Sequence, residues 1–165
     1  MACDIVLMNK DKEIEDFARK LGFTKVFFKE DIKSLKILQT ENYSEKRKVI
    51  ERKQIKILLN PHLLSVKDSL HYRRSGLDHI LCNVMHKNNV AMAFTLNSLN
   101  NYIEIGRLMQ NILLCRKYKV KVLFFSFAEN VYGLKSKSDI ESLLQVLGMT
   151  PGESKNALEF NSFIN

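Results

Sequence analysis

The sequence predicts an α/β protein in which mostly parallel strands are wrapped by helices. Apolar runs of strand length alternate along the chain with segments whose apolar residues recur at helical spacing. These runs are continuously apolar, which is typical of strands that are buried on both faces of a parallel sheet. The 165 residues contain no internal repeat, low-complexity tract or flexible linker, so we expect a single domain over residues 1–165.

The N-terminal part of the chain begins this alternation. We expect a helix from Asp11 to Leu21, and a charged segment from Ser44 to Lys53 follows a polar turn. Four apolar runs predict strands, at Cys3 to Met8, Phe23 to Phe28, Leu35 to Gln39 and Ile55 to Leu59.

A basic loop, a helix and a buried strand follow one another in the middle of the chain. Ser75, with Asp78 three positions later, is typical of a capped helix start. The apolar residues beyond it form one stripe at helical spacing, Leu77, Ile80, Leu81, Val84 and Met85. Asn88 and Asn89 predict the helix end, because asparagine tolerates the left-handed conformation, and the apolar run from Val90 to Leu96 predicts a strand.

The C-terminal part continues with a long helix near Ser98 to Tyr118 and a strand from Val120 to Ala128. Two capping boxes then predict short helices, Ser138 with Glu141 and Thr150-Pro151-Gly152-Glu153. Gly148 is expected to end the first of these helices in the left-handed conformation.

Charge and composition limit the possible partners and surroundings. The formal net charge is +8, from 26 basic and 18 acidic residues, which favours a polyanionic partner. The apolar runs are far shorter than the roughly 20 residues of a membrane helix, and the N-terminus lacks a signal-like segment, so we expect a soluble, unsecreted protein without a membrane partner. The three cysteines lack a disulfide-framework or zinc-binding spacing, which fits a reducing cytosol.

The chain has few residues arranged for catalysis. Its four histidines form no His-x-His or His-Glu-x-x-His pair, and its carboxylates offer no close pair for proton transfer. No glycine-rich phosphate loop is present. His79 and His86 lie seven residues apart on one predicted helix, where two helix-surface imidazoles are the simpler interpretation. The sequence therefore predicts no catalytic residue, no metal site and no cofactor bound by this chain.

Cationic residues, in contrast, occur in three clusters, at Lys46 to Lys56, Lys67 to Arg74 and Arg116 to Lys121. Acidic residues dilute the first cluster, so a solvated face remains the alternative there. The second cluster lies between a predicted buried strand and a predicted helix start. Its side chains and the free amides near Ser75 are therefore expected to bind a phosphate group. Lys135 and Lys137 repeat this arrangement at smaller scale before the next helix.

Three stretches of the sequence resemble a known family. The first joins ILLNPH (Ile57 to His62) with HYRRSGLDHILCNVMHKNNVAMAF (His71 to Phe94), the second is GRLMQNILLCRKYKV (Gly106 to Val120), and the third is VYGLKSKSDIESLLQVLGM (Val131 to Met149). They resemble the basic loop, the Ser-Gly-Leu-Asp-His helix and the Leu-Gly-Met helix end of the TIM-barrel-like protein subunit of ribonuclease P, of the archaeal component 3 type. The N-terminal third matches only in architecture, and Phe127 stands where related proteins have an acidic residue.

The resemblance implies a fold and a function. A (β/α)₈ barrel usually has about 250 residues, so this shorter chain implies a reduced or incomplete TIM-like barrel. The implied function is that of a non-catalytic protein subunit, which supports the catalytic RNA that removes the 5′ leader from precursor tRNA. Magnesium would act with that RNA. The implied partners are the ribonuclease P RNA, a small ferredoxin-like subunit, the other protein subunits and, indirectly, precursor tRNA, in the cytoplasm or, in a eukaryote, the nucleus.

The residues expected to contact RNA are all cationic or imidazole side chains: Lys67, His71, Arg73, Arg74, Arg107, Arg116, Lys135 and Lys137. Two other functions remain open. One is a metal-dependent phosphoesterase of the barrel type, against which the histidine spacing counts. The other is a scaffold that binds only protein, for which the loop from Lys67 to Arg74 would tolerate the loss of its charges.

Overall fold

The strands form two sheets in the computed structural model, which describes residues 1–160. One sheet pairs β1 (Cys3–Ile5) with β2 (Lys25–Phe27). The other has the order β3-β4-β5-β6, with strands at Ile37–Leu38, Ile57–Leu59, Ala91–Thr95 and Val122–Phe125. The pairs β1 with β2, β3 with β4 and β4 with β5 are all parallel. The predicted α/β class with parallel strands is therefore confirmed.

The chain divides into two compact units. Unit 1 consists of residues 1–35, residues 95–97 and the chain from Leu123 onward. Unit 2 consists of residues 36–94 and 98–122. That the whole chain is one domain stays a prediction.

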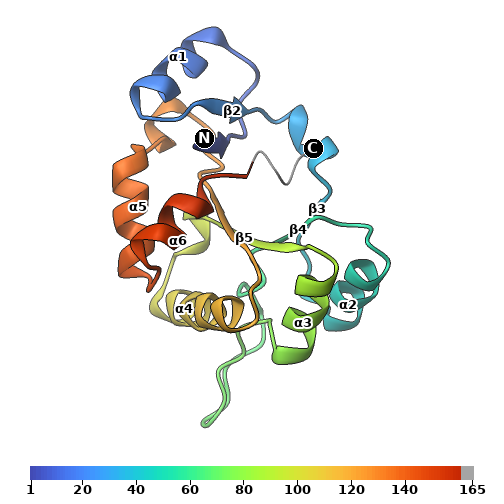
Figure 1. Ribbon diagram of the computed structural model, residues 1–165. Coiled ribbons are helices and arrows are strands. Elements are labelled where there is room, and N and C mark those ends of the chain that lie inside the picture. The colour runs from blue at the N-terminus through green and yellow to red at the C-terminus, as the bar shows by residue number, and fades with distance from the viewer. Residues whose placement is uncertain (161–165) are drawn as a thin grey trace. The chain divides into compact units, whose positions relative to one another are not determined.

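Unit 1 combines the β1–β2 pair with the helices α1 (Lys12–Lys20), α5 (Lys137–Val146) and α6 (Pro151–Ala157). Helix α1 lies beside β2, and α5 lies beside α6 (Figure 1). The core of this unit includes a cluster of buried side chains, Val6, Met8, Phe28, Ala128 and Leu134. All of these residues except Leu134 come from the apolar runs that predicted strands, and burial of such runs stabilises the fold.

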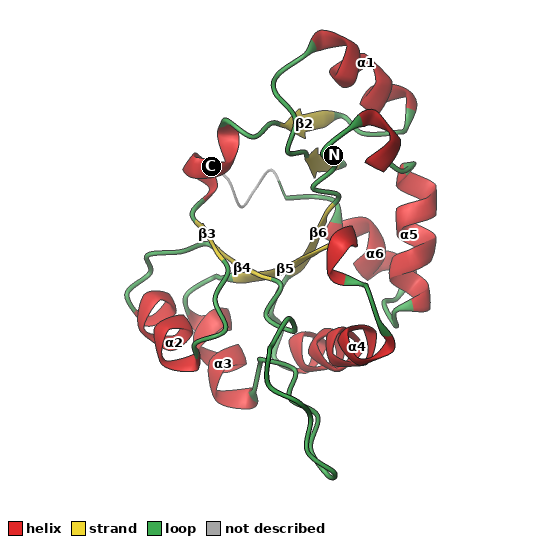
Figure 2. Ribbon diagram, turned by 180° about the vertical axis from the view of Figure 1, so that it is seen from behind, coloured by secondary structure: helices red, strands yellow, loops and turns green. Residues whose placement is uncertain are grey.

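Unit 2 carries the helices α2 (Tyr43–Glu51), α3 (His79–Lys87) and α4 (Tyr102–Lys117). All three lie on the same side of β3, β4 and β5 (Figures 1 and 2). Strands β4 and β5 are buried along their whole length, as their continuously apolar sequence predicts. The long connection between β4 and α3 leaves the carboxyl end of β4, where parallel α/β folds commonly place functional residues.

Helix α3 begins later than the sequence predicts. Its cap is Asp78, whose carboxylate accepts a hydrogen bond from the Leu81 amide at 2.7 Å. The predicted capping role of Ser75 is wrong, since the Ser75 hydroxyl donates to the Leu77 carbonyl at 3.3 Å. The reason is Gly76, whose left-handed backbone (φ 80°) turns the chain before the helix starts.

Helix α5 begins earlier than predicted. Its cap is Ser136, whose hydroxyl accepts from the Asp139 amide at 3.1 Å, so the capping box predicted at Ser138 is wrong. The second predicted capping box is confirmed. Thr150 and Glu153 each accept from the backbone amide of the other, at 3.3 and 2.8 Å, and a proline occupies the first helical position.

The region between β2 and β4 differs most from the prediction. A 3-10 turn at Asp31–Leu35 takes up the start of the predicted strand, and only Ile37–Leu38 remain as β3. The charged segment that follows forms α2, whose cap, Asn42, accepts from the Glu45 amide at 3.1 Å. The long helix α4 starts at Tyr102, after a short 3-10 turn, and not near Ser98 as predicted.

The predicted helix ends agree better with the structure. Asn89 (φ 55°) and Gly148 (φ 102°) both adopt the left-handed conformation directly after a helix, as predicted. Over residues 1–160, no helix has both the length and the apolar character needed to span a membrane. Cys3, Cys82 and Cys115 are buried free thiols.

Candidate nucleic-acid interface

The connection between β4 and α3 forms a hairpin, which we call the basic loop (residues 60–78). It extends away from the strands and helices of unit 2 (Figures 1 and 2). Ser69 and Tyr72 close its tip by an isolated antiparallel bridge, in which each backbone amide donates to the other carbonyl, at 3.0 and 3.3 Å. Leu70 at the tip is 91% exposed, and His71 beside it is also exposed. The loop therefore presents its side chains to solvent.

Arg107 of α4 holds the base of the basic loop. Its buried guanidinium donates to the Asp68 carboxylate (Nε to Oδ1, 2.9 Å) and to two loop carbonyls, Leu64 (Nη1, 3.1 Å) and Val66 (Nη2, 2.7 Å). The hydrogen bond from Arg107 lowers the pKa of the Asp68 carboxyl below its usual range. Asp68 also accepts from the Arg74 amide at 2.9 Å. One carboxylate therefore ties both arms of the hairpin to α4.

Three neighbours of Arg107 contact the basic loop from the same face of α4. The Gly106 carbonyl accepts from Arg73 Nη1 at 3.0 Å. The side-chain amide of Asn111 donates to the Ser75 carbonyl at 2.7 Å, and Gln110 Nε2 lies 3.3 Å from the Ser75 hydroxyl. Residues three or four apart share a helix face, as Arg107 does with Gln110 and Asn111, so a single face of α4 fixes the loop. A Cβ at position 106 would lie only 3.1 Å from the Arg73 guanidinium carbon, so glycine permits this approach.

The basic loop brings together four of the predicted RNA contacts, the exposed residues Lys67, His71, Arg73 and Arg74. Arg73 donates one hydrogen bond within the protein from a guanidinium nitrogen, and Arg74 donates one from its backbone amide. Both side chains still reach solvent. The loop thus concentrates positive charge on a segment whose backbone is held in place.

The other four predicted contacts are not among the exposed side chains of the basic loop. Arg107 is 3% exposed, and its donors serve the loop. Arg116 lies nine residues further along α4, about 14 Å along the helix axis. Lys135 and Lys137 belong to unit 1, where Lys135 donates to a backbone carbonyl and Lys137 lies 3.6 Å from the Glu141 carboxylate. Contact of these residues with RNA stays a prediction, and burial makes Arg107 the least suited of them.

The predicted phosphate site at the start of α3 needs one correction. The helix begins after Asp78, so its first-turn amides are three residues further along than expected. The Arg74 amide is already bonded to Asp68. The cations of the loop, and not free amides near Ser75, are therefore what this segment offers to a phosphate.

Sequence reasoning placed Lys46 in the first cationic cluster but missed its burial beside the basic loop. Lys46 of α2 is 1% exposed, and within residues 1–160 its Nζ makes a single hydrogen bond, to the Gly76 carbonyl at 3.4 Å. Burial lowers the pKa of this lysine, because the charged form loses hydration. A signal was available, since Lys46 lies one helical turn before the buried Ile50 and so on the inward face of α2.

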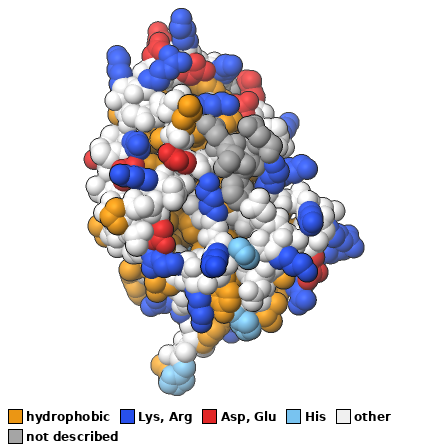
Figure 3. All heavy atoms as spheres, in the orientation of Figure 1, with side chains coloured by type: hydrophobic (Ala, Val, Ile, Leu, Met, Phe, Trp, Pro, Cys, Tyr) orange, Lys and Arg blue, Asp and Glu red, His pale blue; other side chains and the backbone are white. Residues whose placement is uncertain are grey.

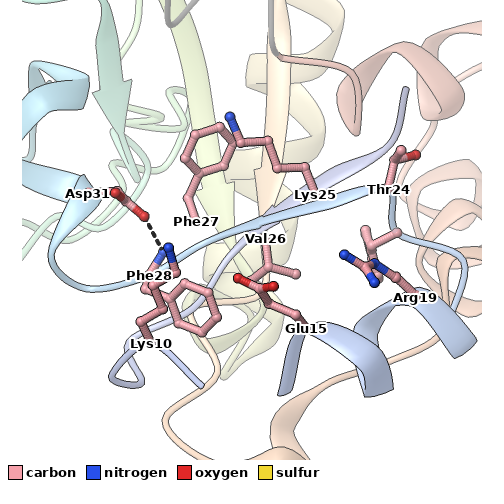
Figure 4. Close-up of a pocket in the computed structure, with 10 residues that line it drawn as sticks. Lys10, Glu15, Arg19, Thr24, Lys25, Val26, Phe27, Phe28 and Asp31 are labelled. Atoms are coloured by element: carbon pink, nitrogen blue, oxygen red, sulfur yellow. Dashed lines mark hydrogen bonds between the residues drawn. The ribbon is translucent and has the colours of Figure 1, made fainter. Parts of the chain in front are cut away.

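A different pocket, of about 330 Å³, lies in unit 1 beside α1 and β2 (Figure 4). Its charged lining residues have both signs: Lys10, Glu15, Arg19, Lys25 and Asp31. Asp31 accepts from the Phe28 amide at 2.9 Å, so this carboxylate is engaged within the fold (Figure 4). Its described lining includes no histidine or cysteine. Nothing in this pocket points to phosphoester chemistry.

Two histidines, His62 and His86, bond to the backbone of the protein. His62 is buried with Nε2 3.1 Å from the Ser98 carbonyl, and burial lowers the pKa of its ring. His86 Nδ1 lies 3.0 Å from the Lys119 carbonyl. Over the described part of the chain, no three His, Cys, Asp or Glu side chains form a group that could hold a metal ion.

Lys and Arg side chains are spread over the face shown in Figure 3, with acidic side chains between them. Positive charge alone therefore does not single out one interface. The basic loop differs from this background because a buried arginine and one helix face fix its position.

No protein-family model matches the chain. It is 30% identical over 118 residues to the ribonuclease P protein component 3 of Methanococcoides burtonii, covering 68% of this chain and 46% of that protein. It is 30% identical over 124 residues to the protein of the same name from Methanococcus maripaludis strain C6, covering 72% and 50%. The chain thus spans about half the length of these curated relatives. It also matches a chain of an archaeal ribonuclease P solved with mature tRNA by cryo-EM, with a TM-score of 0.62 at 21% identity over 98% of this chain and 66% of that chain, a likeness of fold.

Proposed function

We propose that this chain, a relative of ribonuclease P protein component 3, is a ribonuclease P protein subunit that binds and supports the catalytic RNA. On this proposal the RNA removes the 5′ leader from precursor tRNA, and the protein supplies no bond-breaking residue. One structural observation carries it beyond the sequence similarity. The basic loop exposes clustered cations, and the buried Arg107 side chain fixes that loop to α4 through Asp68.

A fixed cationic loop suits RNA for a physical reason. Phosphate contacts by Lys and Arg release counterions from the RNA, and this release dominates nucleic-acid affinity. A loop that is already held in position loses little conformational entropy when it binds. Lys67, Arg73 and Arg74 are therefore the residues that we expect to contact the RNA backbone, with His71 at the tip beside them.

We infer that the fold is a reduced or incomplete TIM-like barrel. The parallel strands, the helices on one side of β3 to β5 and the likeness in fold to an archaeal ribonuclease P chain support this inference. The chain is shorter than the roughly 250 residues typical of a complete barrel.

We infer the partners from the same relatives. They are the ribonuclease P RNA, a small ferredoxin-like subunit and the other protein subunits of the enzyme, with precursor tRNA contacted indirectly. Magnesium belongs to the RNA on this proposal, and this chain binds no cofactor. The three free thiols fit a reducing compartment, the cytoplasm or, in a eukaryote, the nucleus.

A salt titration of binding to ribonuclease P RNA tests the proposal. Arg73→Ala/Arg74→Ala should weaken binding and reduce the slope of log affinity against log salt by about one for each phosphate contact that is lost. The matched control is Arg19→Ala/Lys20→Ala on α1, which removes the same charge from exposed positions of unit 1. If both double variants keep the wild-type slope and affinity, the loop does not bind RNA, and a scaffold that binds only protein becomes the better account.

A further inference from the structure

A second pocket, of about 260 Å³, lies between α2 and the basic loop, within unit 2. The lining residues that carry polar or aromatic groups are Glu41, Tyr43, Lys46, Tyr72, Arg74 and Asp78. Pockets for drug-sized ligands measure roughly 300–1,000 Å³, so this one fits a ligand no larger than about one nucleotide. It brings two cations and two tyrosines to one place.

The two carboxylates of this pocket are bonded to donors of the protein itself. Glu41 Oε2 accepts from the amide and the hydroxyl of Ser65, at 3.0 and 2.6 Å. Asp78 accepts from the Leu81 amide at 2.7 Å and from the Tyr43 hydroxyl at 2.8 Å. These bonds engage both acidic groups within the fold, although Glu41 still interacts electrostatically with Lys46.

Lys46 is the unusual group of the pocket. An ammonium has three donors, yet within residues 1–160 Lys46 Nζ makes one long hydrogen bond, at 3.4 Å to the Gly76 carbonyl. A buried charge with so few partners is costly, and a bound anion would relieve that cost. Arg74, on the exposed side of the same pocket, supplies a second cation. Together they suit a phosphate group.

Tyr72 supplies the surface for a base. Its side chain is 57% exposed and belongs to the bridge that closes the loop tip, so the backbone beneath it is fixed. Aromatic side chains beside cations are a common platform on which proteins stack unpaired bases. We propose that this pocket binds one unpaired nucleotide of an RNA partner, with its phosphate at Lys46 and Arg74 and its base against Tyr72. This inference rests on the proposed RNA-binding function and deepens it.

The test compares two RNA probes bound to the full chain. One is an oligouridylate of about twelve nucleotides, and the other is a hairpin of equal charge whose paired strands are joined by a non-nucleotide linker, so that it has no unpaired base. Tyr72→Ala should weaken oligouridylate binding by about five- to one-hundred-fold and leave hairpin binding unchanged, because stacking acts on unpaired bases. Tyr72→Phe keeps the ring and should bind as the wild type does. Tyr102→Ala is the control, since Tyr102 is 84% exposed on α4 and does not line the pocket. Equal effects of Tyr72→Ala on both probes, or no effect on either, would overturn the proposal.

Lys46→Met tests the phosphate contact, since methionine keeps much of the side-chain length without the charge. It should lower the salt slope for oligouridylate by about one. Should this variant fail to fold, photo-crosslinking of wild-type protein to oligouridylate carrying 4-thiouridine replaces it. Crosslinks in the peptides that contain Tyr43 or Tyr72 support the pocket, and crosslinks confined to other peptides overturn it.

Lys67→Ala/Arg73→Ala separates the two proposals, because neither residue lines the pocket. If this variant weakens binding of both probes while Tyr72→Ala changes neither, the pocket proposal fails and the RNA-binding loop stands. If Lys67→Ala/Arg73→Ala and Tyr72→Ala both leave the binding of both probes unchanged, the proposed function fails, and the nucleotide pocket fails with it.

Discussion

Arg107 Nη2 lies 2.8 Å from Oδ1 of Asp68, and this pair joins α4 to the basic loop. The Arg107 side chain is almost fully buried, whereas that of Asp68 is partly exposed. Two loop carbonyls accept from the same guanidinium. The position of the exposed loop cations therefore depends on one buried side chain that itself does not need to reach the RNA.

Replacing Arg107 by alanine should destabilise the protein by about 2–4 kcal/mol, because two loop carbonyls and the Asp68 carboxylate lose the hydrogen bonds that its guanidinium donates. Urea denaturation measures the change in the free energy of unfolding, and amide hydrogen exchange should show faster exchange in the basic loop. The control is Lys48→Ala, at an exposed position of α2 in the same unit, which should change stability by less than about 0.5 kcal/mol. Equal losses of unfolding free energy in the two variants would contradict the role of Arg107 in holding the basic loop.

Gly76 should not tolerate a side chain. A Cβ at this position would lie 1.8 Å from the Pro61 carbonyl oxygen, and φ is 80°. We expect Gly76→Ala to cost more than about 3 kcal/mol or to prevent folding, since a clash with backbone adds to the strain of the left-handed conformation.

Gly148→Ala is the matched control for Gly76→Ala. Position 148 also has a left-handed backbone (φ 102°), but nothing lies within 4 Å of its Cβ position. It should lose only about 1 kcal/mol, the cost of the conformation itself. Thermal unfolding of the two variants measures the difference, and similar losses would refute the close approach at Gly76.

The start of α5 distinguishes the structure from the sequence pattern. Ser136→Ala should destabilise the protein by about 1 kcal/mol, because its hydroxyl accepts from the Asp139 amide. Ser138→Ala should cost less than about 0.5 kcal/mol, since that residue lies inside the helix. Chemical denaturation measures the stability of both variants. A larger loss for Ser138→Ala than for Ser136→Ala would support the capping box that the sequence predicts.

The sequence predicted those features that depend on local pattern. Continuous apolar runs became the buried strands β4 and β5, and the helix ends at Asn89 and Gly148 follow from residues that tolerate positive φ. Helix α2 was not predicted, because its charged sequence lacks a continuous apolar stripe and its inward face includes Lys46.

The candidate site was predicted in part for the same reason. The four predicted loop contacts are close in sequence, so composition alone could place them together. The Arg107–Asp68 contact joins residues 39 positions apart, and the Lys46–Gly76 contact joins residues 30 apart. Such contacts arise from tertiary packing, for which a single sequence carries no direct signal.

Asp4 should make stability depend on pH. It is buried in β1, where Oδ1 accepts from the amides of Ile5 and Ser126 at 2.8 and 2.7 Å, and burial raises its pKa to about 6. The folded state then binds a proton more tightly than the unfolded state does, so this contribution is present below about pH 4 and is lost as pH rises through about 6. A pKa shift of one unit corresponds to about 1.4 kcal/mol, so this shift of about two units contributes about 3 kcal/mol to the stability of the folded state at low pH.

Asp4→Asn tests this dependence, because the asparagine oxygen can accept the same two hydrogen bonds without a charge. Urea denaturation at pH 4 and pH 7 should show the wild type losing about 2 kcal/mol more than the variant between the two values, because part of the contribution is already lost at pH 4. Equal losses of stability in the wild type and the variant would mean that the pKa of Asp4 is not raised in the folded protein.

Cleavage of precursor tRNA tests the central claim most directly. The matching catalytic RNA is reconstituted in magnesium with its protein subunits, with this chain as wild type, as Arg73→Ala/Arg74→Ala, or omitted. Circular dichroism confirms that the variant is folded. The account predicts that 5′ cleavage falls when the chain is omitted, and falls in the variant because the RNA loses cationic contacts. Unchanged cleavage on omission would contradict the assignment as a ribonuclease P subunit, and full activity of the folded variant would contradict RNA contact by the basic loop.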